Sequence, residues 1–348
     1  MPKQLIVDSN LGPIEASIED LVSAKLNSFI GWNCEAGVQN LYIDFDGRVW
    51  IANCAGAPLN AVKLGNRQPW GYLGEYNTEF RLPTTGVECP KFNCGCGSDI
   101  VISKHRPNHT NSKDEPKIIP ITEVKTISSV RTSYDLPKQI LWDIGRRCNY
   151  SCSYCWPTVH NTTDPHKGLV DLKFTADYCI DRWASGGKIN WYFGGGEPTL
   201  NPDFEPFVDY LSSRDQWIML VTNGSQGPAY WSKNADHYNT LIFSAHFEFM
   251  KPDLFAKNFA RVIEVLKNNP KKLSTFIVKL MTKPGEIEQS KKFVEDLKQE
   301  SKYDLLPDAV RAQVQFDMVP LRDIQKGSQL IDYTEQELEQ VIEFNLKK

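Results

Sequence analysis

The sequence lacks several features that mark membrane, secreted or nucleic-acid-binding proteins. Its 348 residues contain no run of about 18 apolar residues, which a membrane-spanning helix would need. The first five residues, Met-Pro-Lys-Gln-Leu, form no apolar segment, so we expect no signal peptide and a cytoplasmic location. The net charge of −4 at pH 7 excludes a broadly basic surface, which argues against nucleic acid as a partner.

The composition that is present fits a globular chain with one large domain and a smaller one. Apolar residues make up 41% of the sequence and charged residues 24%, which are ordinary values. Nine cysteines without any sign of secretion point to metal or redox chemistry rather than disulfides. Residues 101–137 are polar and interrupted by proline, so we expect a linker there between domains at 1–100 and 138–348.

Three cysteines, Cys148, Cys152 and Cys155, lie together with the spacing C-x3-C-x2-C. Thiols this close in sequence can all reach one metal centre. A structural zinc site needs four ligands, and the nearest candidate for the fourth is His160. A [4Fe–4S] cluster is held by thiolates, and three of them would leave one iron open to a cofactor or substrate. Three unrelated buried thiols are the remaining alternative.

From Gln139 onwards the pattern alternates between strands and helices. Six such repeats with right-handed crossovers predict an α/β fold, either a partial (β/α)6 TIM-like barrel or an open parallel sheet. The expected strands are 140–144, 189–193, 217–222, 240–246, 274–281 and 314–319. The expected helices are 173–184, 204–211, 254–266 and 287–297, with a last helix that begins at the capping box Thr334-x-x-Glu337.

A glycine-rich turn, Gly194-Gly-Gly-Glu-Pro198, ends the second of these strands. No Lys-Ser/Thr pair follows it, which argues against a phosphate-binding P-loop and leaves tight packing or a cofactor site. Thr222 and Asn223 end the third strand and Ser244 lies in the fourth. Each of these residues either binds a cofactor or simply terminates its strand.

Three further polar residues lie on the fourth and fifth strands or just beyond them. His246 and Glu248 flank the end of the fourth strand, on the side that forms the catalytic face of a barrel. They either contact substrate or cap the barrel mouth. Lys279 lies in the middle of the fifth strand, and its side chain points either into the barrel or to solvent. We take all three as candidate catalytic residues.

The cysteine spacing and the glycine-rich turn, in this order, resemble the signature of the radical S-adenosylmethionine (SAM) superfamily. The resemblance implies that Cys148, Cys152 and Cys155 hold a [4Fe–4S] cluster whose open iron binds SAM. It implies that a reductant such as flavodoxin or ferredoxin supplies an electron, that SAM is cleaved to a 5′-deoxyadenosyl radical, and that this radical abstracts a hydrogen atom from substrate. The residues that match cofactor-binding positions of the family are Tyr154, Gly195, Gly196, Glu197, Pro198, Thr222, Asn223 and Ser244.

The N-terminal region contains a predicted β-hairpin between two cysteines. Residues 41–44 and 48–51 read as strands, and Asp46-Gly47 predicts a two-residue type I′ turn between them. A hairpin brings its two ends together, so Cys34 before it and Cys54 after it are expected to be neighbours. The next cysteines form the run Cys89-x4-Cys94-x-Cys96.

These five cysteines predict a second site, which takes either an iron–sulfur cluster or zinc, or else they are buried thiols. The hairpin between Cys34 and Cys54 resembles the opening of a SPASM or twitch domain, which here precedes the barrel. That resemblance implies one auxiliary [4Fe–4S] cluster, with Cys34, Cys54, Cys94 and Cys96 as expected ligands and Cys89 as the substitute.

The substrate is the least determined property. A twitch-like domain favours a peptide or protein substrate, because many members of that family modify peptides. A small metabolite, a nucleoside or RNA is the alternative substrate, and a non-catalytic iron–sulfur or zinc scaffold is the alternative of a different class. Loss of the cofactor site would favour the scaffold. Glu197 and all three loop cysteines are present, so the sequence favours the enzyme.

Overall fold

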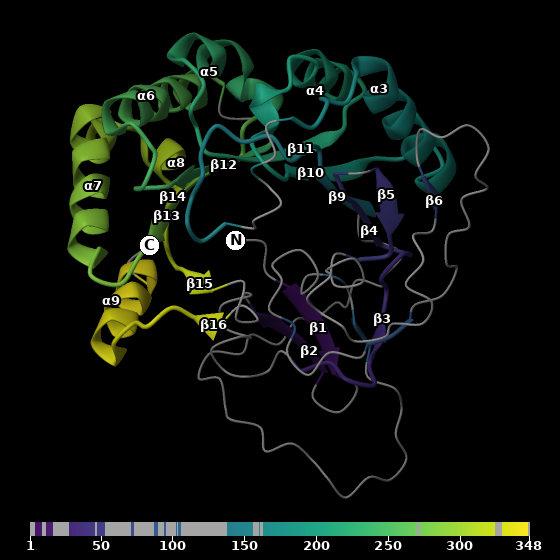
Figure 1. The fold of residues 1–348 in the computed structure, drawn as a ribbon, viewed down its shortest axis with the longest axis horizontal. Helices are drawn as coiled ribbons and strands as arrows, with labels where there is room; N and C mark the ends of the chain where they lie inside the picture. The colour runs from purple at the N-terminus through teal and green to yellow at the C-terminus, as the bar shows by residue number, and fades with distance from the viewer. Residues whose placement is uncertain are drawn as a thin grey trace, which may run out of the picture. The chain divides into compact units, whose positions relative to one another are not determined.

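A computed structural model describes fourteen ranges of the chain (Figure 1). They are residues 4–8, 12–16, 28–45, 47–52, 71–72, 87–89, 94, 102, 104–105, 138–155, 160, 163–269, 272–323 and 329–346. The chain divides into two compact units, and each is described by itself. The first unit comprises Met1–Leu141 and Cys179–Ile189, and the second comprises Trp142–Tyr178 and Asn190–Lys348.

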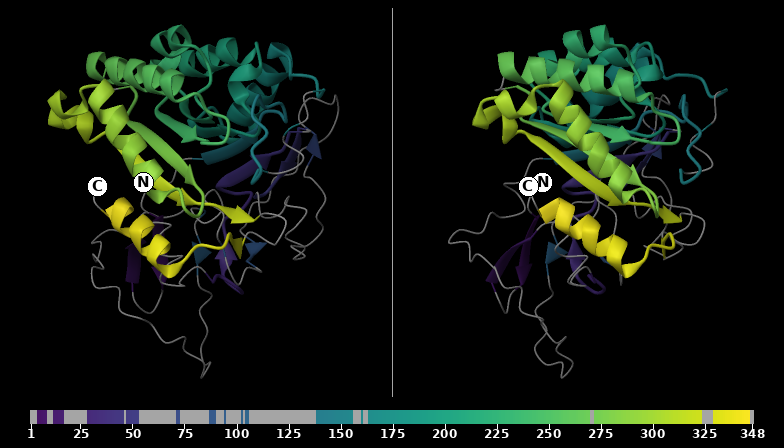
Figure 2. Two further views of the ribbon diagram at one scale, coloured as in Figure 1. Left: turned by 60° about the vertical axis from the view of Figure 1, so that its left-hand side comes forward. Right: turned by 90° about the vertical axis from the view of Figure 1, so that its left-hand side faces the viewer.

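The second unit is built on a parallel sheet with helices along one face (Figures 1 and 2). Its strands run in the spatial order β14-β13-β12-β11-β10, followed by the end of β9, and the described strands do not close into a barrel. All six predicted strands are confirmed. They are β9 (Lys138–Asp143), β10 (Ile189–Gly194), β11 (Trp217–Thr222), β12 (Thr240–Ala245), β13 (Thr275–Thr282) and β14 (Val314–Pro320).

Alternating burial along the strands shows which face of the sheet forms the core. On β11, Ile218 and Leu220 are fully buried whereas the intervening Met219 is only half-buried. Successive side chains of a strand point to opposite faces, so the fully buried set faces the helices. Aromatic rings fill this side; Phe243 packs edge-on against Phe276 with ring centroids 5.0 Å apart. The opposite face carries the half-buried residues and is the inner face of the partial barrel.

The helices follow the predicted order, with two differences. They are α3 (Leu169–Tyr178), α4 (Phe204–Ser213), α5 (Pro228–Asn234), α6 (Pro252–Asn268), α7 (Ile287–Glu300), α8 (Asp308–Arg311) and α9 (Glu335–Leu346). The predicted helix 173–184 starts earlier, at Leu169, and continues after Tyr178 as a π-helical turn, Cys179–Trp183. Helices α5 and α8 were not predicted, because seven and four residues are too few to give a helical repeat. The capping box of α9 is confirmed, since Glu337 N–H donates to Thr334 Oγ1 at 3.2 Å.

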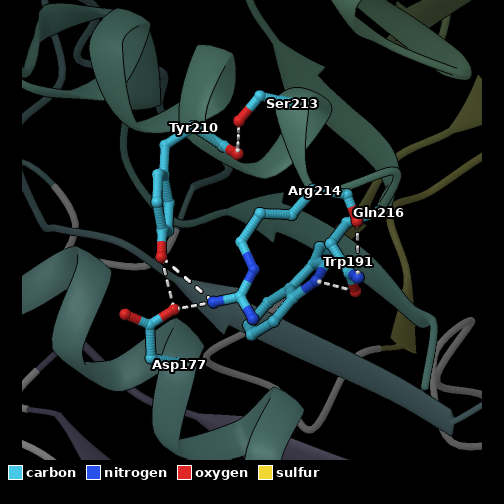
Figure 3. A network of polar contacts seen from close by, with 6 residues as sticks. All are labelled: Asp177, Trp191, Tyr210, Ser213, Arg214 and Gln216. Carbon is cyan, nitrogen blue, oxygen red and sulfur yellow. Dashed lines mark hydrogen bonds and ion pairs between the residues drawn. The ribbon is translucent and has the colours of Figure 1, made fainter. Parts of the chain in front are cut away.

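A polar network ties α3 to α4 at the edge of the sheet where β11 begins (Figure 3). Asp177 accepts hydrogen bonds from the hydroxyl of Tyr210 and from the guanidinium of Arg214. Gln216 extends the network, because its amide oxygen accepts from the Trp191 indole at 3.3 Å. Since this edge is formed by the amino ends of the strands, the network stabilises helix packing and lies away from the carboxyl ends, where sites form.

The first unit contains a five-stranded sheet of mainly antiparallel pairs and an antiparallel hairpin. β1 (Gln4–Asp8) pairs with β2 (Gly12–Ala16), and β3 (Asn33–Cys34) lies between β7 (Val87–Glu88) and β8 (Lys104–His105). The predicted hairpin is confirmed as β4 (Asn40–Ile43) and β5 (Arg48–Trp50), with β6 (Gly71–Tyr72) beside β5.

The predicted type I′ turn of this hairpin is wrong. Ile43 pairs with Val49, so the connection is longer than two residues, and it is closed by a 2.9 Å hydrogen bond from Gly47 N–H to Asp44 O. Gly47 has a φ of +83°, a conformation that favours glycine. The Asp46-Gly47 dipeptide therefore predicts the hairpin correctly, but not the type of its turn.

Most of the predicted linker 101–137 lies outside the described residues. The last short strands of the second unit are β15 (Arg322–Asp323) and β16 (Gln329–Leu330), which pair with each other. Within the described ranges, no helix has the length and apolarity that a membrane span needs.

Candidate functional site

The three clustered cysteines lie on the loop that leaves β9, at the carboxyl edge of the parallel sheet. Cys152 is buried, whereas Cys148 and Cys155 are half-buried. A 3.1 Å hydrogen bond from Cys155 N–H to Cys152 O closes the turn between the last two. Burial raises the pKa of the Cys148 thiol, and burial together with the two neighbouring thiols raises the pKa of Cys152 to about 12. The thiols therefore lie within electrostatic range of one another.

This donor set fits an iron–sulfur cluster better than a single ion. Among the residues that the structure describes, no three His, Cys, Asp or Glu side chains converge to hold one metal ion. Thiolates of a cluster bind different iron atoms, so they stand further apart than the ligands of a single ion. His160, the nearest candidate for a fourth zinc ligand, has both ring nitrogens buried without a hydrogen-bond partner among the described residues. Three thiols on one loop match the three-thiolate expectation.

The glycine-rich turn after β10 lies directly against the segment that leads into the cysteine loop. Gly196 N–H donates to Gly145 O at 2.8 Å, and Glu197 N–H donates to Arg147 O at 2.7 Å. A Cβ atom on Gly196 would lie 2.1 Å from the Arg147 carbonyl oxygen, which no side chain could accommodate. Gly195 has a φ of +106°. The glycines therefore permit the close backbone approach that brings this turn to Cys148.

Glu197 is a buried hydrogen-bonding centre that joins two strand ends. Its side chain is 3% exposed, and Oε1 accepts from the hydroxyls of Thr199 at 2.6 Å and Thr222 at 2.7 Å. Oε2 accepts from Asn223 N–H at 2.7 Å. Burial raises the pKa of Glu197, although these hydrogen bonds oppose the rise. The carboxylate thus binds protein donors on both oxygens, and a contact between it and a cofactor's amino group stays a prediction.

The end of β11 connects this centre to the first cysteine. The side-chain amide of Asn223 donates to Asn149 Oδ1 at 2.8 Å and lies 3.9 Å from the Cys148 sulfur. Asn149 in turn donates to Ser225 Oγ at 2.9 Å. Tyr150 N–H contacts the same Cys148 sulfur at 3.4 Å. The structure therefore brings the predicted residues Thr222 and Asn223 to the cysteine loop.

His246 and Glu248, two candidate catalytic residues, face the cysteine loop. The Tyr154 hydroxyl and His246 Nδ1 are 2.9 Å apart, and the two rings stack with an interplanar angle of 13°. Burial lowers the pKa of His246 to about 4, while Glu248 opposes this shift. His246 is therefore neutral at pH 7, so one of its ring nitrogens is a hydrogen-bond donor and the other an acceptor. Glu248 binds Ser153 and Lys283.

Ser244 and Lys279 lie side by side on the inner face of the sheet. Ser244 of β12 is in register with Lys279 of β13, which is in register with Asp317 of β14. Phe276 and Val278, on the other face of β13, are fully buried against the helices. Because Lys279 alternates with them and is half-buried, its side chain belongs to the inner face.

The predicted second cysteine site is described in part. Cys34, Cys89 and Cys94 are buried, whereas Cys54 and Cys96 lie outside the described residues. Cys34 pairs with Val87 across β3 and β7, and Cys89 N–H donates to Trp32 O at 2.7 Å. Cys34 and Cys89 are therefore diagonal neighbours on one face of the ladder. This placement makes Cys89, the expected substitute ligand, a candidate to share the second site with Cys34.

The structure also shows site residues that the sequence did not single out: Asn149, Ser153, Asn258 and Lys283. Asn258 of α6 is fully buried, and its amide donates to Gly224 O at 2.7 Å and to Gln226 O at 2.6 Å. A buried asparagine amid the apolar positions of a helix is a weak sequence signal for such a role. Nothing in the sequence pairs Lys283 with Glu248.

The geometry defines a parallel α/β protein with a three-thiol loop at the carboxyl edge of its sheet and a Gly-Gly-Glu-Pro turn against that loop. Residues 142–297, which make up less than half of the chain and carry the three-thiol loop, match the model of the radical SAM superfamily. This match implies a [4Fe–4S] cluster and SAM as cofactors.

Individual relatives cover only parts of the chain. It is 30% identical over 131 residues to an S-adenosylmethionine-dependent nucleotide dehydratase of Selenomonas ruminantium, a match that spans 37% of this chain and 39% of that protein. It is 29% identical over 100 residues to the mycofactocin maturase MftC of Mycobacterium tuberculosis, spanning 29% of this chain and 25% of MftC. The chain therefore matches less than half the length of these relatives.

Solved structures show a partial likeness. SuiB of Streptococcus suis, bound to S-adenosylmethionine, aligns with a TM-score of 0.43 and 17% identity over 60% of this chain and 46% of SuiB.

Proposed function

We propose that this chain is a radical SAM enzyme that acts on a peptide or protein substrate. The observation that carries the proposal is the convergence of the three-thiol loop with the turn after β10 and the end of β11. The sulfur of Cys148 lies 3.9 Å from the side-chain amide nitrogen of Asn223. The backbone N–H of Asn223 donates to Oε2 of Glu197. Two sequence motifs of one superfamily thus meet at the carboxyl edge of one sheet.

In this proposal Cys148, Cys152 and Cys155 ligate the cluster, and the backbone of Gly195 and Gly196 holds the amino group of SAM. When bound, cluster and SAM supply a 5′-deoxyadenosyl radical that abstracts a hydrogen atom from substrate. The protein positions both cofactors and excludes water, and a reductant such as flavodoxin or ferredoxin supplies the electron. The buried thiols fit the reducing conditions of the cytoplasm, the location we propose.

Lys279 is the candidate for binding an anionic group at the inner face. Its neighbour Ser244 lies in register on β12, one residue beyond the pair formed by Thr222 and Phe243. Lys279 therefore lies level with the end of β11, two strands away from it in the sheet. A half-buried ammonium at this level suits a carboxylate or phosphate of cofactor or substrate.

The auxiliary cluster is part of the proposal, supported by the nearness of Cys34 on β3 to Cys89, which directly follows β7. Five cysteines at 34–96 are enough thiolates for one [4Fe–4S] cluster or one zinc ion. Iron, sulfide and zinc counts on the protein and on a Cys89→Ala variant distinguish these outcomes. Zinc in place of additional iron contradicts the auxiliary cluster.

The substrate class has two candidates. A peptide is favoured by the similarity to a maturase, MftC, and by the hairpin flanked by cysteines. A small molecule is favoured by the similarity to a nucleotide dehydratase.

The first test is reductive cleavage of SAM. The anaerobically reconstituted protein, given dithionite and SAM, is expected to form 5′-deoxyadenosine, and a Cys155→Ala variant is expected to form none. Absence of product from a wild-type protein that retains its cluster contradicts the proposal. Product formation stimulated by nucleotides but by no peptide moves the substrate to the second class.

A further inference from the structure

The two residues between the second and third loop cysteines are both held by the segment that follows β12. Glu248 accepts from Ser153 N–H on Oε2 at 2.7 Å and from Ser153 Oγ on Oε1 at 2.6 Å. The neighbouring Tyr154 hydroxyl binds His246 Nδ1 at 2.9 Å. Since Ser153 and Tyr154 form the turn that joins Cys152 to Cys155, the segment fixes the conformation of this turn.

Glu248 has a second partner, which comes from a different strand. Lys283 directly follows β13, and its ammonium forms an ion pair with Glu248 Oε1. The side chain of Glu248 is 18% exposed and that of Lys283 is 32% exposed, so solvent screens the two charges only in part. The same ammonium lies 5.9 Å from the centre of the Tyr154 ring. A carboxylate and an ammonium are thus both fixed beside the cysteine turn.

These contacts leave little of Glu248 for a substrate. Both carboxylate oxygens already accept hydrogen bonds from the cysteine loop, and one of them also binds Lys283. A catalytic carboxylate needs an oxygen that can reach the reacting group. The geometry instead matches a residue that acts through the loop it holds.

We propose that Glu248 and Lys283 are positioning residues that preorganise the Cys152–Cys155 turn for the cluster and tune its reduction potential in opposite directions. This rests on the proposed function, since it requires that the loop bind a cluster. Partners that orient metal ligands commonly change metal affinity by about 10–100-fold when they are removed. The potential of a cluster responds to nearby charge, because reduction adds one negative charge to it.

The direction of each effect follows from the sign of the charge. Glu248 opposes the negative charge that reduction adds, so E248Q is expected to raise the potential. Lys283 stabilises the same charge, so K283M is expected to lower it. The double variant removes both charges and is expected to return towards the wild-type value. A purely structural role would not produce opposite signs.

The experiment uses the full chain, reconstituted anaerobically, in four forms: wild type, E248Q, K283M and the double variant. E264Q is the matched control, because Glu264 forms an exposed ion pair with Arg261 within α6. Iron and sulfide are counted first, and the rate of iron loss to a chelator is then measured. The potential is obtained from a redox titration followed by electron paramagnetic resonance.

We expect E248Q to lose iron about 10–100-fold faster than the wild type, with E264Q unchanged. If E248Q takes up no iron, Ser153→Ala, which removes one hydrogen bond and keeps both charges, is expected to lose iron faster at an unchanged potential. Shifts of the same sign in E248Q and K283M, or no shifts in a loaded protein, overturn the proposal. Failure of the wild type to bind a cluster overturns the proposed function itself.

Discussion

The buried carboxylate of Glu197 allows a sharp test of the way the two strand ends are joined. Gln in its place is nearly isosteric and can keep the acceptor that binds the hydroxyls of Thr199 and Thr222. Its NH2 group, however, faces Asn223 N–H, which now donates to Glu197 Oε2 at 2.7 Å. One buried donor loses its acceptor, which costs about 1–3 kcal/mol. Alanine leaves all these donors unpaired, so E197A is expected to lose roughly 3 kcal/mol or more.

The pH dependence of this loss has a definite sign. Burial raises the folded-state pKa of Glu197 above the unfolded value of about 4.3. A raised pKa contributes stability that is complete below the unfolded pKa and is lost as the pH rises through the folded pKa. The stability advantage of the wild type over E197Q is therefore largest near pH 4 and shrinks towards pH 8.

Urea denaturation of the metal-free protein, followed by circular dichroism at several pH values, measures this advantage. The matched control is Glu205→Gln, since Glu205 of α4 is more exposed and pairs with Lys233 on the surface. A stability advantage of the wild type over E197Q that grows with pH would contradict the raised pKa, because it would require a lowered folded-state pKa. An unfolding midpoint of E197A equal to that of the wild type would contradict the structural role of the carboxylate.

Three further predictions follow from the same region. Gly196→Ala places a Cβ against the carbonyl of Arg147, so we expect at least about a tenfold loss of bound iron, measured by iron counts on the reconstituted variant. Asn258→Leu leaves two loop carbonyls without their donor and should lower the free energy of unfolding by about 1–3 kcal/mol for each, as urea denaturation can show. Lys279→Met should keep its iron but bind an anionic cofactor or substrate about 10–100-fold more weakly; calorimetric titration with SAM checks this, and unchanged affinity for SAM moves the expected anion to the substrate.

The parallel sheet could be predicted from the sequence because each strand is a short apolar run between turn residues. β11 and β12 match the expected ranges to within one residue at either end. The loop cysteines and the Gly-Gly-Glu-Pro turn were also predictable, since their chemistry depends on local spacing. The π-helical turn at Cys179 was not, because a helical repeat of apolar residues does not distinguish hydrogen-bonding patterns within a helix.

Side-chain partners were the part that sequence could not supply. Glu248 and Ser153 are 95 residues apart, and their contact depends on how β12 and the cysteine loop are placed in three dimensions. The sequence identified Glu248 by its position after a strand, which is a statement about location. Its two hydrogen bonds and its ion pair show the direction of its side chain, and they change the expected role from substrate contact to support of the loop.

In the proposed function, the loop that carries Cys148, Cys152 and Cys155 holds a [4Fe–4S] cluster that binds SAM. Electron paramagnetic resonance of the dithionite-reduced protein, with and without SAM, tests this assignment. We predict a signal that changes when SAM is added and a change that disappears when all three cysteines are replaced by alanine. A spectrum that SAM leaves unaltered, or a SAM-responsive signal that survives in the triple variant, would contradict the claim.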